Sequence, residues 1–358
     1  MAKVHNFSAG PGILPAEVLK QASEAVIDFD GLNLSLLEIS HRSKNFEAVM
    51  DKARSLVKEL TGLGDDYEVL FLQGGASMQF LQVPMNLMKS DGKAAYINTG
   101  EWATRAIKEA KMMGNCEVIA SSEDKNFNYI PKGFAVPSGL DYLHFTSNNT
   151  IFGTQFHDFP ETDGLLVCDM SSDIFSRRID FSKFDLIYAG AQKNMGPAGT
   201  TLVIVKRDIL GKTGRQIPTM LDYQVHIKGG SMYNTPPVFP IYVSMLTLEW
   251  LKNNGGLAWI EAVNRSKQEL FYNTVDSLPN AFRGTAAKED RSWMNATFVL
   301  ADESKDAEFA AMLKAAEISQ LKGHRSVGGY RASMYNALPL ESVQVLCDVM
   351  KEFANKYA

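Results

Sequence analysis

The chain has 358 residues and a formal net charge of −5 at pH 7, and 45% of its residues are hydrophobic. This length suits roughly two domains, and the composition is typical of a soluble globular protein. Because a phosphate backbone is bound by clustered Lys and Arg, the lack of a basic block argues against nucleic acid as a partner.

The N-terminal residues lack the apolar core of a signal peptide, and no uninterrupted apolar run is long enough to span a bilayer. Neither secretion nor a membrane partner is therefore expected. The three cysteines, Cys116, Cys168 and Cys347, are scattered and form no CxxC motif. They predict neither a disulfide framework nor a metal site, and the cytoplasm is the expected compartment.

The first part of the chain alternates predicted helices and strands. Residues 15–29 have helical spacing, since Val18, Ala22 and Ala25 share one face. Strands are predicted at 68–73, 94–98, 116–120, 143–146, 165–168, 186–188 and 201–205, with helices at 77–88 and from Trp102 onward. This alternation favours an α/β fold with a mainly parallel, seven-stranded sheet covered by helices on both faces.

A smaller α+β domain is predicted to follow. Near Gly229 the character of the sequence changes, and the remaining predicted elements are helices at 235–250, 257–276, 306–316 and 340–357 and a strand at 293–300. The predicted organisation is an N-terminal arm at 1–15, a large domain at 16–259 and a small C-terminal domain at 260–358.

One lysine stands among small residues just after a predicted buried strand. Lys193 follows the apolar run 186–188, and Asp169 directly follows the run 165–168. In open α/β sheets, ligands bind beyond the carboxyl ends of the strands, where both side chains would lie. A lysine that can form a Schiff base and an aspartate that can hold a pyridinium nitrogen are the groups that a pyridoxal-phosphate enzyme supplies. Alone, the lysine suits a solvated loop and the aspartate an N-cap, but their pairing favours a cofactor site in the large domain.

Two further features suit the same cofactor. The segment 74–77, Gly-Gly-Ala-Ser, joins a predicted strand to a helix, and the free amides of a helix start bind phosphate. Such a turn also occurs where the chain merely changes direction, and it is neither a GxGxxG nor a Walker motif. Trp102 lies just past another predicted strand, where it either stacks on the pyridine ring or packs in the core.

These residues together resemble the phosphoserine aminotransferase family, within the fold-type-I, class-V aminotransferases. The match runs nearly end to end through the segments 7–11, 41–44, 74–77, 149–151, 189–194, 233–236 and 322–329. The AGAQKN stretch (189–194) and the KGHRSVGG stretch (322–329) are specific to this family. The resemblance implies the fold-type-I α/β architecture, pyridoxal 5'-phosphate as cofactor, and a homodimer with shared active sites.

The resemblance also implies roles for residues around the cofactor ring. Lys193 matches the Schiff-base lysine and Asp169 the partner of the pyridinium nitrogen. Trp102 matches the stacking ring, and Thr150 matches the residue that touches the ring hydroxyl.

Other matching positions imply a phosphate site. Ala76 and Ser77 match the phosphate-binding helix start, and Gln192 matches a phosphate ligand. Asn234 and Thr235 match residues that reach the cofactor phosphate of the other subunit. Some relatives carry arginine at the Ser77 position, where it helps to bind the substrate phosphate. That charge is absent here, so other cations must make this contact.

The substrates of such an enzyme carry an anion at each end. L-Glutamate has two carboxylates, and a phosphorylated 2-oxo acid has a carboxylate and a phosphate, which arginine forks can bind in bidentate geometry. By resemblance, Arg331 would hold the α-carboxylate. The distal phosphate or γ-carboxylate would be held by two His-Arg pairs, some from the neighbouring subunit: His41, Arg42, His324 and Arg325. Because histidine titrates near neutrality, phosphate affinity is expected to fall as pH rises past the histidine pKa values.

The reaction that the resemblance implies moves the amino group of L-glutamate to 3-phosphohydroxypyruvate, with ping-pong kinetics, and yields O-phospho-L-serine and 2-oxoglutarate for serine biosynthesis. A four-carbon phosphorylated keto acid of pyridoxine biosynthesis, 3-hydroxy-2-oxo-4-phosphooxybutanoate, is an alternative or additional substrate. A cysteine desulfurase is less favoured, because Cys347 lies on an apolar helical face. A non-catalytic anion-binding module would have no use for Lys193. A NAD dehydrogenase is also disfavoured, because the chain lacks the glycine fingerprint of such enzymes.

Overall fold

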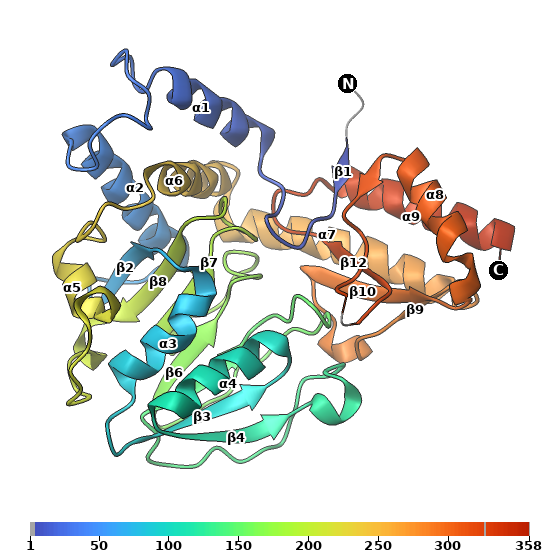
Figure 1. Ribbon diagram of the computed structural model, residues 1–358. Coiled ribbons are helices and arrows are strands. Elements are labelled where there is room, and N and C mark those ends of the chain that lie inside the picture. Colours follow the sequence, from blue (N-terminus) through green and yellow to red (C-terminus); the bar gives the residue numbers. More distant parts are fainter. Residues whose placement is uncertain (1–3, 326, 358) are drawn as a thin grey trace.

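The computed structural model describes residues 4–325 and 327–357. Ser326, which belongs to the 322–329 motif, lies outside the described residues, as do residues 1–3 and 358. The large sheet has seven strands in the order β2-β8-β7-β6-β5-β3-β4 (Figure 1). The strands are β2 (Tyr67–Leu72), β3 (Lys93–Asn98), β4 (Asn115–Ser121), β5 (Tyr142–Thr146), β6 (Leu165–Asp169), β7 (Leu186–Gly190) and β8 (Thr201–Lys206). The predicted mainly parallel, seven-stranded sheet is confirmed.

The five neighbouring strands β7, β6, β5, β3 and β4 pair in parallel. Strand β8 is antiparallel to both of its neighbours, β2 and β7. The reversal follows from the connection: antiparallel strands need only a hairpin, whereas parallel strands need a long crossover. Gly190 of β7 pairs with Thr201 of β8. The hairpin loop at 191–200 therefore lies at the carboxyl end of β7, and it carries Lys193.

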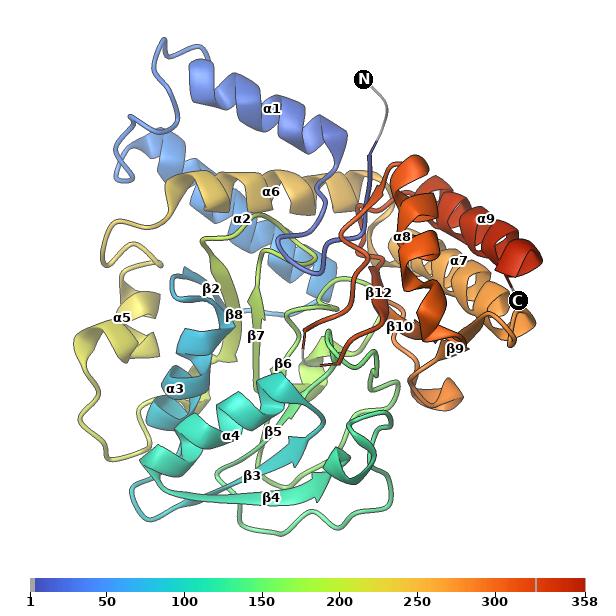
Figure 2. The same ribbon diagram turned by 45° about the vertical axis from the view of Figure 1, so that its right-hand side comes forward.

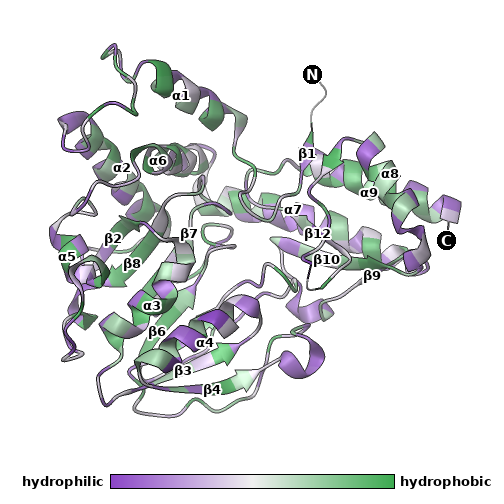
Figure 3. Cartoon of the chain, in the orientation of Figure 1, coloured by the Kyte–Doolittle hydropathy of each residue, from purple (hydrophilic) through white to green (hydrophobic). Residues whose placement is uncertain are grey.

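Helices cover both faces of this sheet, as the alternating pattern predicts (Figures 1 and 2). One face packs on α3 (Gly75–Leu87) and α4 (Glu101–Met113), and the other on α2 (Lys44–Thr61) and α6 (Val238–Asn253). The peripheral helices are α1 (Ala16–Ile27) and α5 (Tyr223–Lys228). Strands enclosed on both sides read as continuous apolar runs, which is why β2, β6 and β8 are coloured hydrophobic in Figure 3.

Helix α2 is not among the predicted elements, although its sequence carries clear end signals. Ser43 caps its first turn by accepting a hydrogen bond from the amide of Phe46, and Gly62 ends it in the left-handed conformation. Its buried face includes Val49 and Leu56. This helix packs on α6 and closes one side of the sheet.

A second hydrophobic core lies around a small antiparallel sheet of β9 (Phe282–Gly284), β10 (Asn295–Leu300) and β12 (Tyr330–Ser333). It is covered by α7 (Gly256–Ser277), α8 (Asp306–Ala315) and α9 (Leu340–Tyr357). Part of the N-terminal arm belongs here, because β1 (His5–Asn6) pairs with β11 (Ile318–Ser319) and Phe7 is buried in this core. Helix α7 contributes Ile260 to the first core and Phe271 to the second, so the boundary between residues 259 and 260 stays a prediction.

Over residues 4–325 and 327–357, none of the helices combines the length and apolarity that crossing a membrane requires. Cys347 lies buried on α9, and burial raises the pKa of its thiol. That environment agrees with a packing role for this cysteine and opposes one as a reactive nucleophile.

Candidate active site

Lys193 extends from the β7–β8 hairpin loop into a polar site at the carboxyl ends of the strands. Its Nζ donates a hydrogen bond to Thr150 Oγ1 at 2.8 Å and lies 5.3 Å from the centroid of the Trp102 ring. Burial lowers the pKa of Lys193 to about 8, against the opposing charge of Asp169, and the nearby Arg331 lowers it further. A substantial fraction of this amine is therefore neutral near physiological pH, as nucleophilic attack on an aldehyde requires.

We expect the lowered pKa of Lys193 to appear in its chemical reactivity. Only the neutral amine reacts with an acylating reagent, so labelling of Lys193 in the cofactor-free protein should rise with pH and reach its midpoint near pH 8. The labelling of exposed lysines should reach its midpoint at about pH 10.4. Competitive labelling followed by mass spectrometry of the Lys193 peptide measures both, with the exposed Lys20 as internal control. A midpoint equal to that of Lys20 would contradict the described environment.

Asp169 ends β6 with a buried carboxylate. Its Oδ1 accepts hydrogen bonds from the amide of Ser171 at 2.9 Å and from Ser171 Oγ at 2.6 Å. Within the described part of the chain, its other oxygen has no hydrogen-bond partner. Burial raises the pKa of Asp169, while Lys193 and the Ser171 bonds act against that rise. A buried carboxylate with one free oxygen is suited to accept a hydrogen bond from a cation, such as a protonated pyridine nitrogen.

The start of α3 presents free backbone amides. Gly74 adopts the left-handed conformation with φ 90°, and no side chain caps the helix. The amides of Gly75, Ala76 and Ser77 have no acceptor among the described residues, so they are available to phosphate oxygens. The side chain of Gln192 likewise has no hydrogen-bond partner in the described ranges.

Arg331 reaches the same site from β12 of the second core. Its Nη1 donates to the carbonyl of Thr150 at 3.2 Å, and its Nε is buried without a partner. None of the ion pairs formed by the described residues includes Arg331, and burial lowers its pKa. A guanidinium with open donors beside Lys193 can bind a carboxylate through two parallel hydrogen bonds.

His324 and Arg325 lie in the segment that leads from β11 to β12. Burial lowers the pKa of His324, and the positive charges of Arg331 and Arg325 lower it further. These interactions place His324 on the same side of the molecule as Arg331. The loss of phosphate affinity that was expected near neutrality therefore shifts to a lower pH for this histidine, because its imidazole gives up its proton sooner.

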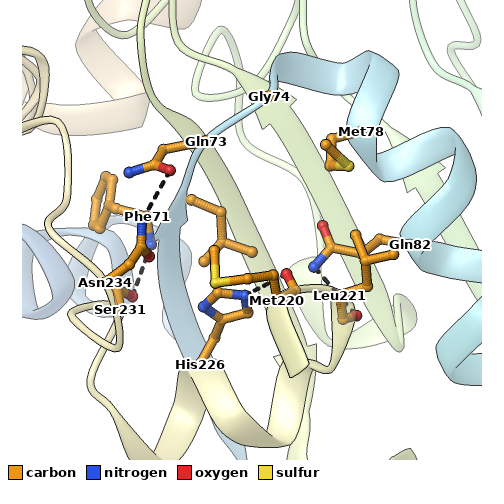
Figure 4. A pocket seen from close by; sticks show the side chains of 11 residues that line it. Phe71, Gln73, Gly74, Met78, Gln82, Met220, Leu221, His226, Ser231 and Asn234 are labelled. Carbon is orange, nitrogen blue, oxygen red and sulfur yellow. Dashed lines mark hydrogen bonds between the residues drawn. The ribbon is translucent and has the colours of Figure 1, made fainter. Parts of the chain in front are cut away.

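Asn234 and Thr235 contact the strand end that precedes α3. Asn234 Nδ2 donates to Gln73 Oε1 at 3.1 Å, and Gln73 Nε2 donates to the carbonyl of Thr235 at 2.9 Å. Figure 4 shows Asn234 and Gln73 on one wall of a cavity of about 110 Å³, with Met78 and Met220 also lining it. Both predicted phosphate ligands thus lie at the edge of the α3 start, on the side of this cavity.

His41 and Arg42 are not brought to Lys193 within one chain. They directly precede α2, and that end of α2 lies away from the carboxyl end of β7 in both ribbon views (Figures 1 and 2). No hydrogen bond or ion pair between described residues links either one to Lys193 or Arg331. The structure therefore brings Lys193 close to Thr150, Trp102, Asp169 and Arg331, but it does not bring this His-Arg pair to them.

Two residues of the site were not predicted. Ser171 holds Asp169, and Asn194 follows Lys193 in the hairpin loop with its carboxamide buried. For Ser171 a local signal existed, because an aspartate side chain often accepts a hydrogen bond from the backbone amide two residues on. The partners of Asn194 are distant in sequence, so no local pattern reveals them.

These residues fit pyridoxal phosphate. The free oxygen of buried Asp169 suits a protonated ring nitrogen, the uncapped start of α3 suits a phosphate, and the indole of Trp102 can stack on a ring. Lys193 has the lowered pKa that attack on an aldehyde requires. No group of His, Cys, Asp and Glu in the described ranges is arranged to hold a metal ion.

Comparisons with known proteins agree on one family for this chain. The family model for aminotransferase class-V matches residues 4–346. The phosphoserine aminotransferase of Flavobacterium psychrophilum is 65% identical over 355 residues, which cover 99% of either chain. The crystal structure of phosphoserine aminotransferase from Bacillus circulans subsp. alkalophilus has a TM-score of 0.96 and 44% identity, covering 99% of both chains. The PLP-bound enzyme of Trichomonas vaginalis has a TM-score of 0.92 and 34% identity, covering 98% of this chain and all of that one.

Proposed function

We propose, on the premise that this chain belongs to the class-V aminotransferase family, that it catalyses the phosphoserine aminotransferase reaction with pyridoxal phosphate. It transfers the amino group of L-glutamate to 3-phosphohydroxypyruvate, which gives O-phospho-L-serine and 2-oxoglutarate. The observation that carries the proposal is a lysine of lowered pKa beside a buried carboxylate at the ends of adjacent strands.

The cofactor would be held at three places. Asp169 would bind its ring nitrogen, Trp102 would stack on the ring, and Thr150 would bind the ring hydroxyl. The first-turn amides of α3 and the side chain of Gln192 would bind its phosphate. When bound, pyridoxal phosphate supplies an electron sink that stabilises negative charge at the substrate Cα.

Lys193 would act as the proton carrier of the reaction. Its neutral Nζ would accept the proton from the glutamate Cα and, as an ammonium, would return a proton at the cofactor carbon C4′. A pKa of about 8 suits both directions of transfer near neutral pH. Asp169 would keep the proton on the ring nitrogen, and its two hydrogen bonds from Ser171 favour the ionised form of this carboxylate against the effect of burial.

The substrate anions would bind at opposite ends of the site. Arg331 has open donors next to Lys193 and would take the α-carboxylate. His324 and Arg325 would contribute to the distal group, which is the γ-carboxylate of glutamate or the phosphate of the keto acid. Ser77, at the start of α3, brings no charge to this end.

Steady-state kinetics test the proposed reaction. With both substrates varied, we expect parallel double-reciprocal lines for glutamate and 3-phosphohydroxypyruvate, as a ping-pong mechanism requires. The four-carbon 3-hydroxy-2-oxo-4-phosphooxybutanoate, assayed in parallel, measures a role in pyridoxine biosynthesis. An unphosphorylated three-carbon keto acid is the matched control, and equal kcat/KM for it would overturn the phosphate specificity.

We expect Arg331→Lys to weaken glutamate binding more than turnover. An ammonium replaces the fork with a single point of contact, and the loss of one charge-assisted hydrogen bond costs about 1.5–3 kcal/mol, or ~10–100-fold in affinity. The KM for glutamate should rise by roughly that factor, with a smaller change in kcat. Arg283→Lys, at an exposed position on β9, is the matched control. An unchanged KM for glutamate would remove Arg331 from the carboxylate site.

The complete site would form in a homodimer. Its distal cations His41 and Arg42 lie away from Lys193 in the same chain, so a second copy would supply them. The segment just before them exposes large apolar side chains, with Leu32, Leu34 and Leu37 at 40%, 49% and 61% exposure. An exposed apolar cluster is typical of a protein interface.

Subunit mixing tests this shared site. Lys193→Ala and Arg42→Ala chains should each be nearly inactive, but a mixed dimer has one site with both residues intact. After subunit exchange of an equal mixture, activity should recover to about a quarter of the wild-type value, since half of the dimers are mixed and each has one competent site. A chain that carries both substitutions forms dimers without a competent site, so no recovery of activity is expected for it. If the mixture stays inactive, Lys193 and Arg42 act within one subunit.

The cellular setting follows from the same reaction. We assign the enzyme to serine biosynthesis in the cytoplasm, where its free cysteines Cys116, Cys168 and Cys347 stay reduced. Expression in a serine auxotroph that lacks this transamination step measures that role, and failure to restore growth without serine would contradict it.

A further inference from the structure

Three consecutive backbone carbonyls in the loop after β6 accept hydrogen bonds from three different asparagines. The carbonyl of Ile174 accepts from Asn194 Nδ2 at 2.6 Å, and that of Phe175 accepts from Asn336 Nδ2 at 2.9 Å. The carbonyl of Ser176 accepts from Asn264 Nδ2 at 2.8 Å. Phe175 has a positive φ of 57°, a conformation that a bulky residue keeps only where its surroundings enforce it.

The three asparagines are also bonded to one another. Asn194 Oδ1 accepts from the backbone amide of Asn336 at 2.9 Å, and Asn336 Oδ1 accepts from Asn264 Nδ2 at 2.9 Å. All three side chains are buried, with at most 7% exposure. We call Asn194, Asn264 and Asn336 the carboxamide clasp. Buried amides in such a network hold their neighbours in one arrangement, because each lost bond leaves a polar group unpaired.

The carboxamide clasp joins the elements that carry the site. Asn194 directly follows Lys193 in the hairpin loop, and the three carbonyls belong to the loop that begins after Asp169. Asn336 follows β12, the strand that holds Arg331, and Asn264 lies on α7, which runs from the first core into the second. The reacting amine, the ring-nitrogen partner and the carboxylate-binding cation are thus linked through this one network.

A buried lysine strengthens the attachment of the segment that contains Asn336. Lys267 Nζ donates to the carbonyls of Met334, Tyr335 and Leu338 at 3.0, 2.8 and 3.3 Å. It lies on α7 one turn after Asn264, so both residues fix the same stretch of chain to the same helix face. Tyr335 in turn donates to the carbonyl of Ala9 at 2.6 Å, which ties in the N-terminal arm.

We propose that the carboxamide clasp is a positioning device that sets the Lys193 amine relative to Asp169 and Arg331. This deepens the proposed function and rests on it for the role of Lys193. No member of the clasp is among the residues assigned above to substrate or cofactor; each acts through the backbone of the loop that it holds. Because a shift of about 1 Å in a reacting group can cost ~100-fold in rate, a network that fixes these loops governs turnover.

The test uses variants at Asn336. Asn336→Ala removes the bonds to Phe175 and Asn264, and Asn336→Asp keeps the volume but places a carboxylate oxygen against the Phe175 carbonyl. Asn86→Ala is the matched control, since this buried asparagine of α3 makes its own hydrogen bonds to Leu221 and Tyr223 elsewhere. Melting temperature, kcat, KM for glutamate and the labelling midpoint of Lys193 in the cofactor-free protein are measured for each.

We expect Asn336→Ala to lower kcat at least ~10-fold and to raise the labelling midpoint of Lys193 above 8, because the loosened loop after β6, to which Asn194 holds the hairpin loop, lets water reach the amine. Asn86→Ala should lower the melting temperature by a similar amount. Its kcat should stay within ~2-fold of wild type, and its labelling midpoint of Lys193 within ~0.3 pH units. For Asn336→Asp, the ratio of its kcat to that of wild type should rise as pH falls, because a protonated carboxyl donates to Phe175 as the amide does.

Two outcomes would overturn the proposal. The first is that the labelling midpoint of Lys193 in both Asn336 variants equals the midpoint in Asn86→Ala. The second is an Asn336→Asp to wild-type kcat ratio that does not depend on pH. If Asn336→Ala does not fold, the Asn336→Asp protein with its carboxyl ionised supplies the same comparison, and the same protein at low pH is its control. The labelling readout needs no turnover, so it separates a failure of this proposal from a failure of the proposed reaction.

Discussion

Replacement of Lys193 by alanine should reduce kcat by ~10⁴-fold or more. The substitution removes both the amine that attaches the cofactor and the group that carries the Cα proton, and acid–base catalysis alone contributes up to about 10⁴-fold. It should also abolish covalent attachment of the cofactor. Borohydride reduction followed by mass spectrometry of the peptide that contains residue 193 measures this directly.

Two companion variants define the cause of that loss. Lys193→Arg keeps a positive charge but cannot deprotonate or form the imine, so it should be as inactive as Lys193→Ala. Lys206→Ala removes a lysine of β8 that pairs with Asp185, and this variant should retain activity within ~2-fold. Substantial turnover by Lys193→Arg would show that charge, and not imine chemistry, is what this position supplies.

Asp169→Asn should lower kcat by ~10²–10³-fold. Removing one partner of a buried charge pair costs about 3–5 kcal/mol, which corresponds to roughly that factor in rate. The ring nitrogen would lose its proton, so the cofactor would withdraw electrons less well and bind less tightly. Since the charge of Asp169 raises the pKa of Lys193, its removal should also move the labelling midpoint of the lysine below 8.

The matched control for this prediction is Asp290→Asn. Asp290 is also buried, but it pairs with Lys132 and accepts from the amide of Ile130. Its substitution should lower stability while leaving kcat within ~2-fold and the labelling midpoint of Lys193 unchanged. Equal kinetic losses in the two variants would mean that burial of a carboxylate, and not its position at the end of β6, accounts for the effect.

Local signals in the sequence account for much of the large domain. The apolar runs at 165–168 and 186–188 predict β6 and β7, because strands enclosed on both faces consist mostly of apolar residues. The residues that come after each run then lie at the carboxyl edge of the sheet, which is how Asp169 and Lys193 could be paired before their geometry was known. The Gly74-Gly75 turn gave the start of α3 for a similarly local reason.

Helix α2 could also have been predicted, because the sequence carries the signals for its two ends and its buried face. Its N-cap Ser43, its C-terminal Gly62 and its apolar face all lie within one segment. By contrast, nothing local marks β8 as antiparallel. Its direction follows from the short hairpin loop, and a loop length becomes informative only once the neighbouring strands are known to pair.

Residue patterns along the chain were enough to predict the strand ends, the lysine and the carboxylate beyond them, and the Gly-Gly turn before α3, because each depends on residues close together in the chain. Tertiary structure alone decided that Arg331 meets Thr150, that Phe7 joins the second core, and that His41 and Arg42 lie away from Lys193. It also created the carboxamide clasp, whose bonds join residues 20 to 161 positions apart. Such contacts arise only when separate elements pack, and no periodicity or spacing along the chain encodes which distant side chains will meet.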